Sequence, residues 1–411
     1  AYCRTECFLQ HDRNDAMMRR FSSLVCLLAL GACAPQTQGD VLEKVVLLSR
    51  HGIRSPTQSP QDMERRTGHA WPVWSVAPGE MTDHGAKTLA AMVQAVQETY
   101  RKTGVLPASG DCQTMEQESV VWADTADHRT RQTGEIWAKG IAPECAVKAQ
   151  WAPTAADPVF NALGTQSGRV DPTALRRDFD AAERTLPEPA STNALNRLQA
   201  LLAPKGCLSD PASPQCLAGP TKIEWKKGTP RLQGGFVTGG MAAESLLLAY
   251  SEGLSLTGFG ITERDAPAFI DAIMPAHEAE NHLLRRLPEY ARARNSIMAE
   301  SIRAFLSDRS VPSIPSVLPS TKVLVLAGHD TNLAAMMALF GLDWSFPDQP
   351  DSTAPNTVLA FERWRYSDGT RDIRVRIFHQ SLVELREGRA PDIEASAITL
   401  SPSWPVLARQ P

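Results

Sequence analysis

The sequence lacks an excess of basic residues. Its 411 residues include 42 lysines and arginines against 46 aspartates and glutamates, which gives a formal net charge of -4 at pH 7. Proteins that bind nucleic acid normally concentrate basic residues, because contacts to phosphates supply much of their affinity. The charge balance therefore argues against nucleic acid as a partner.

The sequence also lacks a long apolar run near its N-terminus. The run at residues 21–30 is too short to cross a bilayer as a helix. It follows Met17, Met18 and two arginines, and small residues come directly after it, which is the order of a secretory signal. We therefore predict that residues 17–33 are a signal peptide and that residues 1–16 are a leader outside the fold.

Two interpretations of the end of this signal stay open. The string Leu30-Gly31-Ala32-Cys33 resembles a bacterial lipobox, in which Cys33 is lipidated and anchors the mature protein to the membrane. A plain signal peptide that is cut near Ala32 or Ala34 needs no lipid. Both interpretations predict an exported protein, which is periplasmic or secreted.

Cysteine pairs of the Cys-x-x-Cys type, which would suggest zinc, are absent after the predicted signal. The four cysteines that remain are Cys112, Cys145, Cys207 and Cys216. An even number in an exported protein favours disulfides over free thiols. Of the three pairings that four cysteines allow, the most local one joins Cys112 to Cys145 and Cys207 to Cys216.

What the sequence does contain is a pattern of globular α/β proteins. Hydrophobic residues make up 43% of the chain and charged residues 21%, which suits one large domain or two. Largely apolar runs at 45–49, 119–122 and 322–327 predict strands. A helix that Thr82 caps follows the first strand, and a helix that ends at Gly341 follows the third. Strands alternating with helices indicate an α/β fold.

The composition changes in the middle of the chain. Residues 166–284 are helical in pattern and rich in alanine, leucine and proline, whereas the segments at 357–364 and 373–378 are strand-like again. We therefore predict an α/β catalytic domain made of residues 41–165 and 285–400, with a mixed central sheet flanked by helices. The helical segment is expected to be a cap subdomain, inserted over the carboxyl edge of the sheet.

Three of the predicted strands end in clusters of polar and charged residues. Because ligands of open α/β sheets bind beyond the carboxyl ends of the strands, we expect these clusters to form one site. The residues concerned are Arg50, His51, Arg54, Arg129, His329 and Asp330. Cations that converge with one carboxylic acid suit phosphoryl transfer.

Phosphoryl transfer needs groups that bind the phosphate and a nucleophile. Arginine pairs bidentately with phosphate oxygens and stays charged, so Arg50, Arg54 and Arg129 are predicted to hold the phosphate. The nucleophile is expected to be a neutral ring nitrogen in line with phosphorus. His51 is the candidate, since Gly52 beside it lets the backbone approach closely.

The leaving group needs a proton as its bond to phosphorus breaks. Asp330 is predicted to supply this proton and then to activate water, while the adjacent His329 binds the phosphate. Such an acid has to be protonated at the working pH, so acidic conditions are expected to favour the reaction. No metal or other cofactor is required. Arg131 competes with Arg129 for the role of the third arginine.

Two strings carry a resemblance to a known family. They are Arg50-His51-Gly52-Ile53-Arg54-Ser55-Pro56 and Gly328-His329-Asp330-Thr331-Asn332. Together they resemble the histidine acid phosphatase branch of the histidine phosphatase superfamily, and especially its bacterial phytase and glucose-1-phosphatase members. The resemblance implies a phosphoglycerate-mutase-like sheet, a covalent phosphohistidine intermediate and the catalytic and phosphate-binding roles given above.

The resemblance also bears on the substrate pocket. The positions that line the pocket of phytases are matched here by Thr57, Met241, Glu244 and His277. The sequence departs from bacterial phytases at Gln58, where many of them carry a lysine, and at Asn281, where they carry an aromatic residue. Both departures argue against a highly phosphorylated inositol as the preferred substrate.

His277 and His282 invite a metal hypothesis. At about 100° per residue their side chains lie roughly 140° apart on a helix, whereas the zinc motif needs histidines four positions apart on one face. The spacing therefore argues against a metal site.

We expect a monomeric, exported acid phosphatase that hydrolyses small phosphomonoesters. A dedicated phytase or a glucose-1-phosphatase is the alternative within the family. A phosphomutase shares the Arg-His-Gly opening, but mutases of the superfamily are cytoplasmic and use a glutamate as the acid, so the export signal and Asp330 count against it. A phosphate-binding protein without catalysis would not need every chemical residue, and all of them are present.

Overall fold

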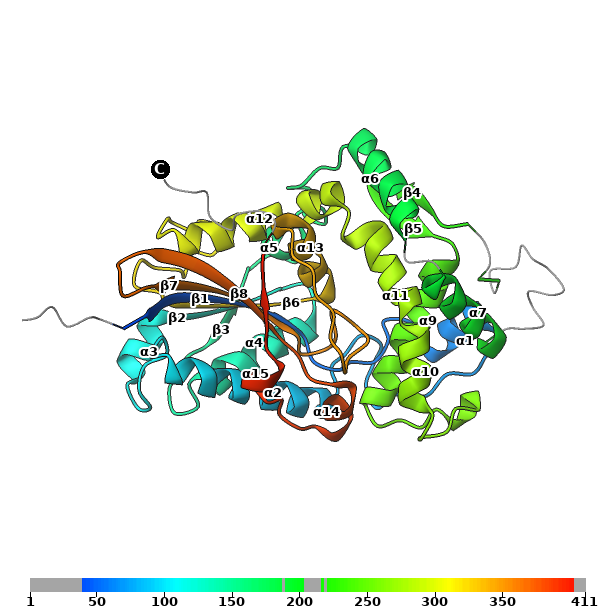
Figure 1. Cartoon of the computed structure of the whole chain (residues 1–411), viewed down its shortest axis with the longest axis horizontal. Coiled ribbons are helices and arrows are strands. Elements are labelled where there is room, and N and C mark those ends of the chain that lie inside the picture. Colours follow the sequence, from blue (N-terminus) through cyan, green and yellow to red (C-terminus); the bar gives the residue numbers. More distant parts are fainter. Residues whose placement is uncertain (1–38, 187–188, 203–215, 218–219, 403–411) are drawn as a thin grey trace, which may run out of the picture. The chain divides into compact units, whose positions relative to one another are not determined.

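The computed structural model describes residues 39–402, apart from 187–188, 203–215 and 218–219. The predicted leader, the predicted signal peptide with Cys33, and Cys207 lie outside the described residues. Figure 1 shows the described part as a twisted sheet with helices on both faces and further helices beyond one end of its strands.

The described strands form a mixed seven-stranded sheet of order β3-β2-β6-β1-β7-β8-β9 and a separate hairpin. Strands β3, β2, β6 and β1 are parallel, and β7, β8 and β9 continue the sheet as antiparallel neighbours. The bounds are β1 Val41–Arg50, β2 Ser119–Ala123, β3 Ala149–Trp151, β4 Lys222–Lys226, β5 Thr229–Gln233, β6 Val323–Gly328, β7 Val358–Arg365, β8 Arg371–Phe378 and β9 Ile398–Leu400. The predicted mixed α/β sheet is confirmed.

The described helices cover this sheet and form a second group beyond it. In chain order they are α1 Pro60–Thr67, α2 Asp83–Lys102, α3 Cys112–Glu118, α4 His128–Ile141, α5 Pro158–Asn161, α6 Pro172–Thr185, α7 Ala190–Leu202, α9 Gly235–Ser251, the 3-10 helix η1 Thr257–Phe259, α10 Ala266–Ile273, α11 Pro275–Glu280, the π-helix η2 Asn281–Arg285, α12 Pro288–Leu306, α13 Asp330–Phe340, α14 Leu382–Glu387 and α15 Ile393–Ser396.

The apolar run of β1 is unbroken because both faces of the strand are buried. Val45 and Leu47 belong to a core cluster with residues of α2 and α4. Val46 and Leu48, on the opposite face, belong to a cluster with residues of α12 and α13. Successive side chains of a strand point to opposite faces, so a core on both sides removes the usual polar alternation. Figure 1 shows these two helix pairs on opposite sides of the sheet.

Two predicted helix ends are present in the structure. The Thr82 hydroxyl begins α2 by accepting a hydrogen bond from the Gly85 backbone N–H at 2.9 Å. Gly341 ends α13 with a positive φ of 59°, a left-handed conformation that glycine adopts without a side-chain clash. Local sequence signals therefore set where these helices begin and end.

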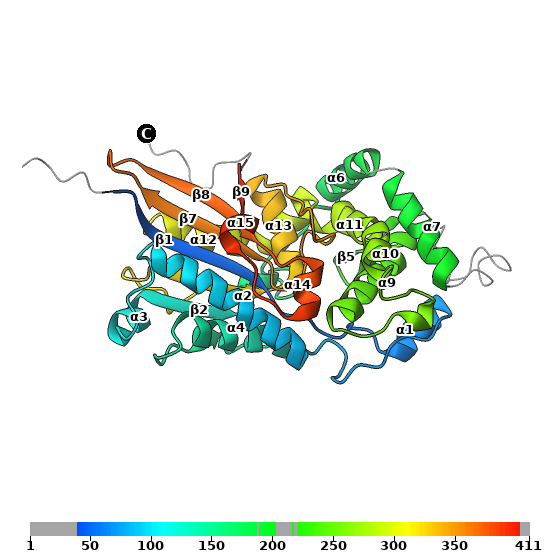
Figure 2. The same ribbon diagram turned by 60° about the horizontal axis from the view of Figure 1, so that its bottom comes forward.

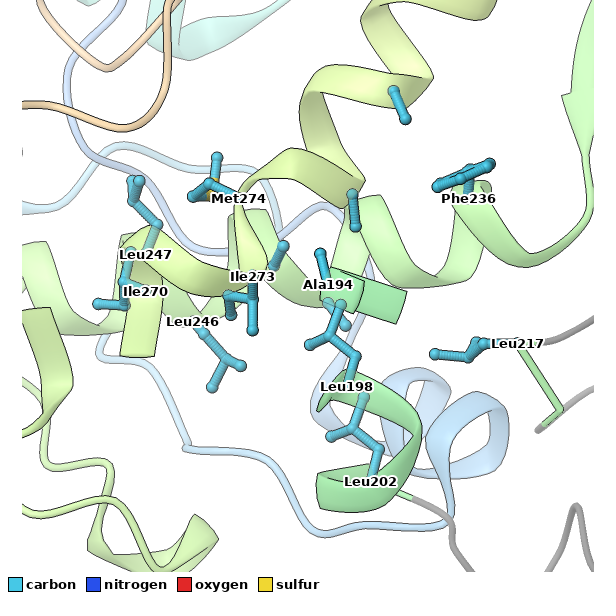
Figure 3. Close-up of a cluster of buried hydrophobic side chains, with 14 of the residues drawn as sticks. Ala194, Leu198, Leu202, Leu217, Phe236, Leu246, Leu247, Ile270, Ile273 and Met274 are labelled. Atoms are coloured by element: carbon cyan, nitrogen blue, oxygen red, sulfur yellow. The ribbon is translucent and has the colours of Figure 1, made fainter. Parts of the chain in front are cut away.

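A second hydrophobic core lies in the region that the sequence predicts to be a cap. It packs between α7, α9 and α10, and Figure 3 shows Leu198, Leu246, Ile273 and Met274 among its fully buried members. Figure 2 shows these helices beyond the end of β1. Contacts join the chain from residue 39 onward into one unit, so the domain boundaries at 166 and 284 stay a prediction.

This region also contains the hairpin of β4 and β5, which the sequence analysis did not predict. Lys226 pairs with Thr229, and the turn between them is Lys227-Gly228 with φ values of 51° and 80°. Two positive φ values in a two-residue loop are those of a type I′ turn. Only the glycine of the pair favours this conformation, so the turn signal in the sequence is weak.

One of the two predicted disulfides lies within the described residues. Cys112, at the start of α3, is bonded to Cys145. Cys216 is also disulfide-bonded, and its predicted partner, Cys207, lies outside the described residues. In the described part of the chain, we find no helix whose length and apolar character would let it cross a membrane.

Candidate active site

The register of the parallel strands brings the predicted site together. Arg50, the last residue of β1, pairs with Gly328, the last residue of β6. The His51 backbone N–H then donates to the Gly328 carbonyl at 3.1 Å, and the Asp124 backbone N–H, just after β2, donates to the Ala327 carbonyl at 3.0 Å. Residues that directly follow three neighbouring strands therefore lie side by side at the carboxyl edge of the sheet.

The loop after β1 lies directly on the N-terminus of α2. A Cβ atom on Gly52 would lie 2.6 Å from the Gly85 carbonyl oxygen, and a Cβ atom on Gly85 would lie 2.1 Å from the Ile53 carbonyl oxygen. Neither position leaves room for a side chain. The Thr82 backbone N–H donates to Ile53, which fixes the same contact by a hydrogen bond of 3.1 Å.

His51 has the tautomer and the charge that a nucleophile needs. Its Nδ1 lies 2.9 Å from the Gly52 carbonyl oxygen, which can only accept, so Nδ1 carries the proton and Nε2 keeps the lone pair. The side chain is buried. Burial, and then the guanidinium groups of Arg129, Arg54 and Arg50, hold the pKa of His51 well below its usual range. The ring therefore stays neutral in acidic solution.

Three arginines surround this imidazole, and each of them donates to a carboxylate. Arg50 Nη2 donates to Glu244 at 2.7 Å, and Arg54 Nη2 donates to the same carboxylate at 3.2 Å. Arg50 Nη1 donates to Asp351 at 3.0 Å. Arg129 donates to the Gly79 carbonyl at 3.2 Å and to Asp127 at 2.9 Å.

These arginines still have unused donors. Among the described residues, the buried Nε atoms of Arg50, Arg54 and Arg129 have no hydrogen-bond partner. A buried donor without a partner costs free energy, and an oxyanion in the site is a natural acceptor for it. The arginine arrangement is therefore suited to a phosphate group.

Glu244, predicted as a residue of the substrate pocket, faces the arginines. Burial alone would raise the pKa of Glu244, but Arg54 and Arg50 lower it to about 2. Glu244 is therefore a permanent carboxylate, and its described contacts fix the two guanidinium groups. Sequence reasoning assigned it to the pocket only by resemblance, and it missed Asp351 entirely.

His329 lies beside His51, with ring centroids 5.6 Å apart and ring planes at 78°. Its Nε2 donates to Asp124 Oδ2 at 2.8 Å. The sequence analysis did not predict Asp124. Its position directly after β2, at the carboxyl end of a strand, could have indicated it. A carboxylate on one ring nitrogen fixes the orientation of the imidazole.

Asp330 begins α13 and faces the site. Its Oδ2 accepts from Arg285 Nη1 at 2.7 Å, and the sequence analysis did not predict this contact. Burial acts to raise the pKa of Asp330, but Arg285, Arg50 and Arg54 outweigh burial and hold that pKa well below the usual range. In the free protein the expected proton donor is therefore a carboxylate.

Arg131, the alternative to Arg129 as the third arginine, contacts a different part of the chain. Arg131, on α4, donates through Nη1 to the carbonyl of Thr125, in the loop before that helix. Arg129 is close enough to lower the pKa of His51. The geometry therefore favours Arg129 as the third phosphate-binding arginine.

The remaining pocket candidates differ in their exposure. Thr57 is exposed and donates to Gln58 at 3.1 Å, and Met241, on α9, is half-buried. His277 is buried, with Nε2 3.9 Å from Asp351, and neither ring nitrogen has a hydrogen-bond partner among the described residues. His282 Nε2 lies 3.1 Å from the Ala182 carbonyl. The described residues contain no cluster of potential metal ligands.

A neutral buried imidazole among guanidinium groups, at the carboxyl edge of a mixed α/β sheet, defines an enzyme that handles phosphate. Residues 41–208 match the model of the histidine phosphatase superfamily, branch 2. Phytase AppA of Escherichia coli is 33% identical over 390 residues, which cover 90% of this chain and 88% of that protein. The chain belongs to the histidine phosphatase superfamily, branch 2, and is a phytase-like phosphomonoester hydrolase.

Two further proteins, one compared by sequence and one by structure, are also similar to this chain. A glucose-1-phosphatase of Salmonella typhimurium is 24% identical over 372 residues, which cover 88% of this chain and 86% of that protein. The apo structure of Hafnia alvei phytase superimposes with a TM-score of 0.77 at 29% identity, and the match covers 90% of this chain and 92% of the phytase. The fold expected from the resemblance is therefore confirmed.

The close packing of the loop on α2 makes a testable prediction. Gly85→Ala places a Cβ atom against the Ile53 carbonyl, so the loop that carries His51 has to shift. We expect kcat/KM for p-nitrophenyl phosphate to fall by about 10- to 100-fold, since a misplacement of about 1 Å costs that much. Steady-state kinetics on protein whose folded state is checked by circular dichroism measures this.

Gly258→Ala, in η1, is the matched control, because no neighbouring atom lies within 4 Å of the added Cβ. This variant is expected to keep wild-type activity. Wild-type kcat/KM in a folded Gly85→Ala protein would contradict the claim that the contact positions His51.

Proposed function

We propose that this protein is an acid phosphatase of broad specificity that passes the phosphoryl group through a covalent phosphohistidine on His51. The observation that carries the proposal is the state of His51, whose Nε2 lone pair lies among three guanidinium groups with unused Nε donors. A neutral nucleophile surrounded by fixed positive charge suits attack on a phosphate dianion.

The reaction has two steps. Arg50, Arg54 and Arg129 hold the phosphate and offset the charge on its oxygens, while His51 Nε2 forms a bond to phosphorus as the bond to the leaving oxygen breaks. Asp330 gives its proton to that oxygen, so the product leaves as an alcohol. Asp330 then accepts a proton from water, and the water oxygen displaces His51 from phosphorus to give inorganic phosphate.

Acidic conditions suit this arrangement for a specific reason. An imidazole of ordinary pKa would be mostly protonated at a pH of about 5 and would lose its nucleophilic lone pair. The pKa of His51 is lowered by burial and by the arginines, so the neutral form persists as the pH falls. The same acidity favours a protonated Asp330.

The role of Asp330 predicts a dependence on the leaving group. Asp330→Asn should slow the hydrolysis of an alkyl ester such as 2-glycerophosphate by about 100-fold or more, because an alkoxide leaves only when protonated. The loss for p-nitrophenyl phosphate should be much smaller, since its phenolate is a good leaving group. Comparing kcat/KM of both substrates in wild type and variant measures the effect, and equal losses would refute proton donation by Asp330.

The surroundings of Gln58 support simple monoesters as substrates. A cleft of about 160 Å³ lies beside the loop after β1, and its lining includes Ser55, Pro56, Gln58, Trp71 and Trp74. None of its lining residues is charged. A dry cavity of about 150 Å³ accommodates a benzene ring. The cleft therefore suits an uncharged, ring-sized leaving group better than a second phosphate.

Position 58 gives the corresponding prediction. Gln58→Lys should raise kcat/KM for phytate from several-fold up to a few hundredfold, because an ammonium near a second phosphate contributes roughly 1 to 4 kcal/mol. The value for p-nitrophenyl phosphate should hardly change. Added salt should reduce the gain if it is electrostatic. A wild type that already prefers phytate, or equal gains on both substrates, would favour a dedicated phytase and contradict the assignment.

We further propose that the protein is exported, through the signal predicted at residues 17–33, and that it acts as a periplasmic or secreted monomer. The disulfide between Cys112 and Cys145 supports an oxidising compartment. Lipidation of Cys33 and a plain cleavage near it remain alternative endings of the signal. Mass spectrometry of the mature N-terminus distinguishes a lipidated cysteine from a free terminus.

A further inference from the structure

One arginine of the site faces the acid instead of the nucleophile. Arg285 Nη1 lies 2.7 Å from Asp330 Oδ2, and the two side chains are 19% and 12% exposed. The other carboxylate oxygen, Oδ1, accepts from the backbone N–H of Thr331 at 2.9 Å. Hydrogen bonds donated to both oxygens favour the ionised form of a carboxyl group.

The π-helical turn of η2, which ends at Arg285, fixes the position of this residue. The Arg286 N–H donates to the Asn281 carbonyl at 2.9 Å, five residues back, so the last turn before α12 is wider than an α-helix. The Arg285 guanidinium also donates to Asn281 Oδ1 at 3.1 Å and to Glu280 at 3.4 Å. Arg286 turns away to Glu278, at 2.7 Å. Of these two neighbouring arginines, Arg285 is therefore the one that contacts the acid.

Charged and titratable groups face Asp330 from several elements. They are Arg285 of η2, Arg50 of β1, His51 and Arg54 of the loop after β1, Arg129 of α4 and Glu244 of α9. A phosphomonoester dianion in the site offsets the charge of the arginines that bind it. Arg285 donates directly to Asp330 Oδ2 and still favours the carboxylate. The protonation of Asp330 is thus a balance between Arg285 and the bound oxyanion.

We propose that Arg285 is a positioning residue that holds Asp330 as an oriented carboxylate in the free enzyme, so that Asp330 takes up a proton from solvent only when an oxyanion occupies the phosphate site. This role rests on the proposed function of Asp330 as the proton donor. The proton that enters with binding is the one that later passes to the leaving oxygen. Coupling of this kind keeps the acid ready only in the complex that uses it.

Sulfate is the probe, because it is a tetrahedral dianion that brings no proton at a pH of about 5. Isothermal titration calorimetry of sulfate binding in two buffers with different ionisation enthalpies gives the number of protons taken up per sulfate bound. We expect uptake in wild type and little uptake in Asp330→Asn, which identifies the group that gains the proton.

Arg285→Gln should shift the pH dependence of this uptake upward by about 1 to 3 pH units, which repeating the titrations at a series of pH values from about 3 to 7 measures. Removing an opposite charge at this distance raises a carboxyl pKa by about 1 to 3 units, so Asp330 takes up its proton at a higher pH both with and without sulfate. Arg285→Lys keeps the charge and should restore the wild-type pH dependence. Arg292→Gln is the matched control, since Arg292 pairs with Glu289 on α12, is 53% exposed and should leave the uptake at the wild-type value.

The inference is overturned if wild type takes up no proton at any of these pH values, or if Arg285→Gln keeps the wild-type pH dependence of the uptake that depends on Asp330. Failure of this inference can be distinguished from failure of the proposed role of Asp330 as the proton donor. If the uptake behaves as expected while Asp330→Asn slows both ester substrates equally, proton donation fails and the coupling stands. If Asp330→Asn selects between the esters while Arg285→Gln keeps the wild-type pH dependence of the uptake, only the role of Arg285 fails.

Discussion

Everything in this site depends on burying guanidinium groups without using all of their hydrogen-bond donors. A buried arginine is costly unless carboxylates pair with it. Glu244 and Asp351 pair with Arg50, whose side chain is fully buried. These pairs use the terminal nitrogens and leave the Nε donors unused among the described residues. The site therefore keeps donors for an oxyanion, and the guanidinium groups still lower the pKa of His51.

The sheet supplies the precision that this charge balance needs. Parallel pairing of β1 with β6 and of β6 with β2 places the residues that follow each strand next to one another. His51, His329 and Asp124 thus meet on a rigid edge, and Gly85 holds the His51 loop against α2. A site built from strand ends moves little, which suits a nucleophile that has to point in line at phosphorus.

The part of this arrangement that could be predicted is local. Apolar runs predicted β1 and β6, and the charged residues at their ends predicted the place of His51 and Asp330, because parallel strands share one carboxyl edge. The contacts that could not be predicted join distant segments. Glu244 meets Arg50 across 194 positions, and Asp351 meets it across 301. No local pattern marks such partners, because only the tertiary fold brings these distant segments together.

The central claim is that the phosphoryl group passes through His51, and trapping the intermediate tests it most directly. A phosphorus–nitrogen bond survives alkali, so wild type mixed with phosphorus-labelled p-nitrophenyl phosphate and quenched in alkali should retain about one labelled phosphate per active site. Peptide mapping should place the label on His51, and His51→Ala should carry no label and show no turnover. A label on another residue, or full turnover in His51→Ala, would contradict the account.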